Sequence, residues 1–200
     1  MRLSLAALSF VLLLPLTSHA RTLGSAWKTA SEETDAARTL RMARNASDRA
    51  YRLDMDLQML RRSVTEAKDV LAQAAADPAR RERLEFLLKF LGDAYPVQGD
   101  SASYVLDKVL WLKYELGKPA APELPAVAAE LVARIKLADA SSRALRQDVD
   151  ALKAALDAAP AAAGERSLWL AGQLADSAAR LDVYTAYVVE KAKVLEKPAA

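Results

Sequence analysis

Apolar residues recur at alternating intervals of three and four along three long segments, and this repeat constrains the fold more than any other feature. Each segment has a single polar exception, which is Thr39 in the first, Ser142 in the second and Thr185 in the third. An average period of 3.5 residues kept over many turns predicts α-helices that pack at small crossing angles with left-handed supercoiling. The three sets of positions are Ala36, Thr39, Ala43, Ala46, Ala50, Leu53, Leu57, Leu60, Val64, Ala67, Leu71 and Ala74; Ala128, Leu131, Ile135, Ala138, Ser142, Leu145, Val149, Leu152, Leu156 and Ala159; and Ala171, Leu174, Ala178, Leu181, Thr185, Val188, Ala192 and Leu195.

The fold class predicted from this repeat is all-α. The chain has only 6 Gly and 8 Pro, whereas sandwiches and barrels need many turn residues. Short connections between long amphipathic helices favour antiparallel neighbours. We therefore expect an elongated up-and-down antiparallel helical bundle of four to five helices with coiled-coil-like heptad packing. The expected helices are 26–75, 78–95, 101–116, 124–159 and 165–196.

The middle of the chain is expected to form a shorter helical hairpin over residues 78–116. Asp77 followed by Pro78 is a typical helix start, with an N-cap and a proline at the first helical position. Proline and glycine between residues 95 and 99 predict a break there, after which Asp100 can cap a second short helix. Gly117 is a typical residue to follow a helix. Residues 118–125, with three prolines, form the clearest loop, and residues 160–164 form the last turn.

The first twenty residues have the three parts of a secretory signal peptide. Arg2 supplies the positive charge, an apolar run follows over residues 3–16, and small residues precede an expected cut after Ala20. The alternative is an uncleaved membrane anchor, but fourteen residues span only about 21 Å, less than the roughly 30 Å hydrocarbon core. We therefore expect a periplasmic or secreted protein with one domain over residues 21–196 and a disordered tail at 197–200.

The residue inventory excludes several kinds of chemistry. The chain has no cysteine, and its one histidine, His19, lies in the expected signal peptide. Haem ligation, thiolate zinc sites and His- or Cys-dependent catalysis are therefore ruled out for the mature chain. Asp54 and Asp56 point about 200° apart on a helix and cannot share a metal ion. We expect no cofactor, no metal site, no catalytic residues and no enzymatic activity.

Charge gives little direction toward a partner. The formal net charge is +2, which is too small to direct the chain to nucleic acid. Pairs four residues apart in the first helix, such as Arg44–Asp48, Arg52–Asp56 and Arg62–Glu66, predict a solvated face with intrahelical ion pairs. The local basic cluster of Arg80, Arg81 and Arg83 lies in the first turns of a helix, where the macrodipole disfavours cations, so it is a candidate contact for an acidic partner.

Aromatic residues gather in one region, between residues 86 and 114. They are Phe86, Phe90, Tyr95, Tyr104, Trp111 and Tyr114. One interpretation is that this region packs between two long helices, which buries the rings in the core. The other is that the rings form a groove or exposed patch that binds a partner or an apolar ligand. Thr39, Ser142 and Thr185 are expected to set helix register or to bond a backbone carbonyl.

From these observations we expect a non-catalytic secreted or periplasmic helical interaction protein, such as an adaptor, a chaperone-like protein or an envelope scaffold. Its partner would be another envelope or periplasmic protein, or a second copy of the chain. The alternative is a periplasmic carrier or sensor that binds a small apolar ligand in the bundle near residues 86–114. We expect no stable membrane insertion after signal cleavage, because nothing after the signal peptide approaches 18 uncharged apolar residues, and a lipid-surface protein is disfavoured because no helix has a basic polar face.

Overall fold

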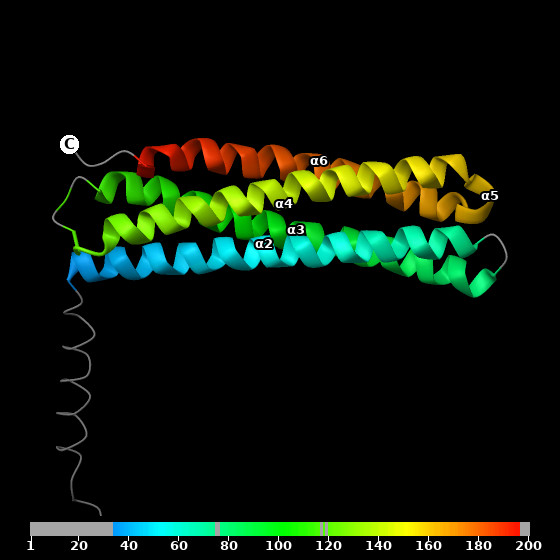
Figure 1. The fold of residues 1–200 in the computed structure, drawn as a ribbon, viewed down its shortest axis with the longest axis horizontal. Coiled ribbons are helices and arrows are strands. Elements are labelled where there is room, and N and C mark those ends of the chain that lie inside the picture. The colour runs from blue at the N-terminus through cyan, green and yellow to red at the C-terminus, as the bar shows by residue number, and fades with distance from the viewer. Residues whose placement is uncertain (1–33, 75–76, 117, 119, 197–200) are drawn as a thin grey trace, which may run out of the picture.

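The computed structural model describes residues 34–74, 77–116, 118 and 120–196. The expected signal peptide, the start of the first expected helix, Gly117 and the tail at 197–200 lie outside these ranges. Long α-helices dominate the described part, in which no strand occurs. They are α2 (Asp35–Ala74), α3 (Pro78–Glu115), α4 (Leu124–Ala158) and α6 (Glu165–Ala192), with a single turn, α5 (Pro160–Ala163), before α6 and a 3₁₀ turn, η1 (Lys193–Glu196), after it (Figure 1).

The four long helices form an elongated all-α bundle in which successive helices run in opposite directions (Figure 1). The predicted fold class is therefore confirmed. Helix α2 packs against α3 and α4, and α6 packs against the same two helices, whereas in the described residues the backbones of α2 and α6, and those of α3 and α4, are too far apart to be direct neighbours. The chain thus crosses the end of the bundle diagonally between α3 and α4. As a result, α2 and α4 are neighbours that run in the same direction.

The three predicted repeats are the buried faces of α2, α4 and α6. All their positions are buried except Ala36 and Ala159, which lie near helix ends and are half-buried. Thr39 donates a hydrogen bond to the Asp35 carbonyl at 2.9 Å, and Thr185 donates one to the Asp182 carbonyl at 3.1 Å. The expected role of these two polar positions is confirmed. The Ser142 hydroxyl, by contrast, has no partner in the described structure.

The predicted hairpin over residues 78–116 is wrong, because α3 is one continuous helix with Pro96 inside it. A proline in a helix interior lacks the N–H of one backbone hydrogen bond and costs about 3 kcal/mol. The burial of a fourth heptad repeat offsets this cost. The repeat continues without interruption on both sides of Pro96 and Asp100. Its buried positions are Leu84, Leu88, Leu91, Tyr95, Gln98, Ala102, Val105, Val109 and Leu112.

Two local predictions at helix ends are confirmed. The Asp77 carboxylate accepts a hydrogen bond from the Ala79 N–H at 2.9 Å, and Pro78 is the first residue of α3. The turn at 160–164 contains the short α5 and ends at Gly164, whose φ of 78° and ψ of 155° are accessible almost only to glycine. The chain therefore reverses at this position into α6.

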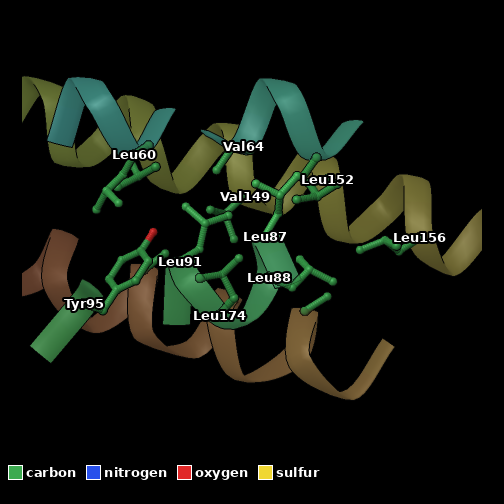
Figure 2. Packing of buried hydrophobic residues seen from close by; sticks show 14 of the residues in the cluster. Leu60, Val64, Leu87, Leu88, Leu91, Tyr95, Val149, Leu152, Leu156 and Leu174 are labelled. Atoms are coloured by element: carbon green, nitrogen blue, oxygen red, sulfur yellow. The ribbon is translucent and has the colours of Figure 1, made fainter. Parts of the chain in front are cut away.

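The core consists of two apolar clusters, one in each half of the bundle. Figure 2 shows part of the first cluster, in which leucines of α3 and α4 meet Leu60 of α2 and Leu174 of α6. Polar side chains lie where the clusters adjoin, among them Gln98, Ser142 and Thr185. Thr185 also lines a cavity of only about 10 Å³, which has room for roughly one water molecule.

Candidate functional site on helix α3

The structure places the six predicted aromatic residues in two different environments. Tyr95 is buried in the core, as Figure 2 shows. Phe86, Phe90 and Tyr114 are 57 %, 48 % and 72 % exposed, respectively. Tyr104 is 37 % exposed, and Trp111 is half-buried. Helix α3 is thus not covered on all sides, and the core interpretation applies fully to Tyr95 alone. The predicted binding role of the other residues stays a prediction.

Four surface residues of α3 repeat every seven positions and form one stripe. They are Phe90, Val97, Tyr104 and Trp111, and Phe86 adjoins the stripe one helical turn before Phe90, in the same seven-residue line as Asp93. In a helix of a bundle, residues seven apart lie on the same face. We call these five residues the α3 stripe. Sequence reasoning missed Val97, although its seven-residue spacing from Phe90 and Tyr104 was the signal that could have found it.

The α3 stripe lies along the groove between α3 and α2. Tyr104 lines an open hollow of about 520 Å³ together with Asp100 of α3 and four residues of α2: Asn45, Asp48, Arg49 and Arg52. Arg83, seven residues before Phe90, donates to Glu66 of α2 across the same groove. The opposite side of α3 faces α6, where Glu85 approaches Arg166 at 3.5 Å.

Charge differs on the two flanks of the α3 stripe. On the outer flank, Asp93, Asp100 and Asp107 repeat every seven residues, and all three are exposed. On the inner flank lie Arg49 and Arg52 of α2, together with Asp48, whose carboxylate accepts a hydrogen bond from Arg134 of α4. Neither Arg49 nor Arg52 forms an ion pair within the described ranges, although Asp100 lines the same hollow. An apolar stripe with an acidic flank and a basic flank can bind and also orient a partner.

Cations stack on two aromatic rings of the stripe. The guanidinium of Arg83 lies 5.2 Å from the centre of the Phe86 ring, and the ammonium of Lys108 lies 5.2 Å from that of Tyr104. Such contacts contribute about 0.5–1 kcal/mol at exposed sites. They hold the two rings against the helix surface, so the stripe is partly ordered before any partner arrives.

The three basic residues predicted to contact an acidic partner each have a partner within the chain. Arg83 pairs with Glu66, and Arg80 approaches Asp77 at 3.9 Å. Arg81 donates to the Ala74 carbonyl at 3.3 Å. This carbonyl belongs to the last residue of α2, where the macrodipole favours a cation. The favourable interaction of Arg81 with the end of α2 therefore compensates for its unfavourable position at the start of α3. The acidic-partner role stays a prediction.

The hydroxyl of Tyr95 is buried and has no hydrogen-bond partner in the described structure. Its ring points into the first cluster beside Leu91 and Leu60 (Figure 2). Burial, and secondarily the negative charge of Asp150, raises the pKa of the Tyr95 phenol well above its ordinary value of 10.0. This tyrosine therefore remains neutral and serves packing.

The predicted intrahelical ion pairs of α2 are not the ones that form. Asp48 accepts from Arg134 of α4 at 3.0 Å, and Glu66 pairs with Arg83 of α3, as described above. The neighbouring helices bring cations that are better placed than those four residues away. Arg61 likewise donates to Asp148 of α4 at 2.8 Å, and Ser141 of α4 donates to the buried carboxylate of Asp54, as does Gln58 at 3.0 Å.

No structural feature of the described residues points to a metal or a membrane span. No group of three acidic, histidine or cysteine side chains among them could hold a metal ion. Within the same ranges, none of the helices combines the length and the apolarity needed to cross a bilayer.

No family model, no curated protein and no solved structure matches this chain. The structure itself places the described residues in the class of four-helix bundles, with an exposed apolar stripe on α3.

Proposed function

We propose that this chain is a non-catalytic interaction protein of the periplasm or cell exterior that binds a protein partner through the α3 stripe. The proposal rests mainly on the exposure of this stripe. Apolar surface gathered in one place on a soluble protein commonly marks an interaction site, and aromatic residues are enriched among those that dominate binding energy. The secretory signal pattern at residues 1–20 supports the location.

The interior favours this function over a small-ligand carrier. Drug-sized ligands occupy pockets of about 300–1,000 Å³ that cover most of their surface. The cavity between the two core clusters is about 10 Å³, and the described interior beside α3 is filled by leucine, valine and alanine side chains. Binding of a ligand inside the core would therefore need a core that opens, whereas the interaction function uses the surface as it is.

The test is site-specific photo-crosslinking in cells. A photoreactive phenylalanine analogue is placed at Tyr104, and a matched control carries it at Val183, which is exposed on α6. We expect the Tyr104 variant to give a discrete adduct with another polypeptide, and the Val183 variant to give none. Phe90→Ser should weaken the Tyr104 adduct without changing the helical circular dichroism. Equal labelling at both positions would refute the proposal.

A further inference from the structure

We propose that the α3 stripe, when no other partner is bound, is covered by the same stripe of a second copy, and that the two α3 helices run parallel in this dimer. The inference rests on the proposed function of the stripe as a docking surface, and it names one occupant for it. The charges on the two flanks of the stripe carry the argument, because they are self-complementary in only one of the two symmetric arrangements.

A symmetric dimer brings the same patch of two copies face to face. If the two-fold axis runs perpendicular to the helices, the α3 helices are antiparallel and each flank meets the same flank of the other copy. The acidic flank with Asp100 and Asp107 would then face its own duplicate, and Arg49 and Arg52 would face theirs. Like charges opposed in this way repel each other, which disfavours the antiparallel arrangement relative to the parallel one.

If the two-fold axis runs along the helices, each flank meets the opposite flank of the other copy. The acidic flank of one copy then lies over the basic flank of the other, twice by symmetry. The heights along the bundle also agree, because Arg49, Arg52, Asp100 and Tyr104 line a single hollow, and Asp107 lies two helical turns from Asp100. A dimer with parallel α3 helices therefore needs no shift of one copy along the other.

The charged groups of both flanks are available for this contact. Within the described ranges Arg49, Arg52, Asp100 and Asp107 form no ion pair with each other or with other residues. Asp48, which lines the same hollow, is instead paired with Arg134 of α4, and Arg61 is paired with Asp148 of α4. We expect the apolar stripe to supply most of the affinity, since exposed ion pairs contribute little, and the charges to set the orientation.

The absence of cysteine from the whole chain permits a direct test of orientation. In the parallel dimer every residue near the axis meets its own duplicate, at both ends of the stripe. In the antiparallel dimer only a residue at the centre does so. Disulfides form when the two Cα atoms lie about 4.4–6.8 Å apart. We expect Phe90→Cys and Trp111→Cys, each as a single variant, to form disulfide-linked dimers under mild oxidation.

A matched control is Val183→Cys on α6, which is 67 % exposed and should remain monomeric under the same oxidation. Sedimentation velocity measures the dimer without crosslinking. We expect the purified wild-type protein to dimerise as its concentration rises, and Arg49→Glu/Arg52→Glu and Asp100→Arg/Asp107→Arg to lose this dimer. An equimolar mixture of the two variants should dimerise again, because each flank then meets its opposite charge. Circular dichroism confirms that both variants fold.

Three results would overturn the dimer: a wild-type monomer at all concentrations, disulfides that form at the centre but not at both ends of the stripe, or charge variants that dimerise as wild type does. None of these results would by itself refute the proposed function, because the Tyr104 photo-crosslinker still reports a different polypeptide by its mass. Loss of both the dimer and the Tyr104 adduct would refute both proposals.

Discussion

Helix α2 has two long sides that differ in how their surface residues are used. On the side toward α4, three contacts at seven-residue intervals along α4 join the parallel helices: Arg134 with Asp48, Ser141 with Asp54 and Asp148 with Arg61. On the side toward α3, the described cross-helix ion pair is Glu66 with Arg83, and the remaining surface is the hollow and the α3 stripe. The contacts on the first side fix how α2 and α4 align along the bundle. On the second side, apolar and charged groups remain available to bind a partner.

The largest expected difference between core and stripe is at adjacent residues of α3. Leu91 is fully buried and Phe90 is half exposed. Leu91→Ala should lower the free energy of unfolding by about 2–5 kcal/mol through lost burial and a cavity. Phe90→Ala should lower it by less than about 1 kcal/mol. Urea denaturation measures both. An equal loss at the two positions would show that the stripe serves folding.

The next comparison sets the α4 side of α2 against its α3 side. Asp54→Ala removes the acceptor of the Ser141 and Gln58 hydrogen bonds and should cost about 1–3 kcal/mol of stability. Arg52→Ala, two positions earlier on the hollow, should change stability by about 0.5 kcal/mol or less. The midpoint of thermal unfolding reports both changes. A cost for Arg52→Ala as large as that for Asp54→Ala would contradict the contrast.

A smaller effect of opposite sign is expected at the boundary between the core clusters. The Gln98 Oε1 atom is buried without a hydrogen-bond partner, and leaving such a group unpaired is unfavourable. Gln98→Leu should therefore raise the free energy of unfolding by about 1 kcal/mol. Guanidinium denaturation tests this, with Gln147→Leu on the exposed face of α4 as the control. A loss of stability in Gln98→Leu would mean that the amide is paired in solution.

The last expected effect is confined to alkaline pH. Because burial raises the pKa of Tyr95 in the folded state, the neutral phenol contributes stability that is fully present below its unfolded pKa of about 10 and is lost as pH rises above that value. Tyr95→Phe should flatten this decline. Unfolding free energies measured from neutral to alkaline pH provide the check. Identical pH dependence in the two proteins would place the hydroxyl in contact with water.

Much of the fold could be predicted from periodicity. The repeats of α2, α4 and α6 are unambiguous because nearly every position is apolar, and Asp77 followed by Pro78 marks a helix start with little ambiguity. The α3 repeat was harder to detect because Pro96 and Gly99 are local signals for a break. Burial along the rest of the repeat outweighs that local preference, since tertiary packing supplies most helix stability.

Other features could not be predicted, because they depend on which helices become neighbours. The sequence pattern of one helix does not reveal that α3 and α4 lie diagonally opposite each other in the bundle. It therefore does not reveal that Asp48 pairs with Arg134 rather than with Arg44 or Arg52. For the same reason, the aromatic cluster could be located in the sequence, but the burial of Tyr95 and the exposure of Phe86 depended on the face that α2 and α6 leave open.

The diagonal crossing between α3 and α4 has a consequence for how the chain folds. Helices α2 and α3 can meet as a local hairpin, but α4 must then pack beside α2, whose last residue lies about fifty positions before the first residue of α4. Closing such long loops costs entropy before the apolar contacts compensate for it. The α2–α3 hairpin alone would leave its faces toward α4 and α6 uncovered. We therefore expect cooperative folding, in which no half of this bundle is stable without the other.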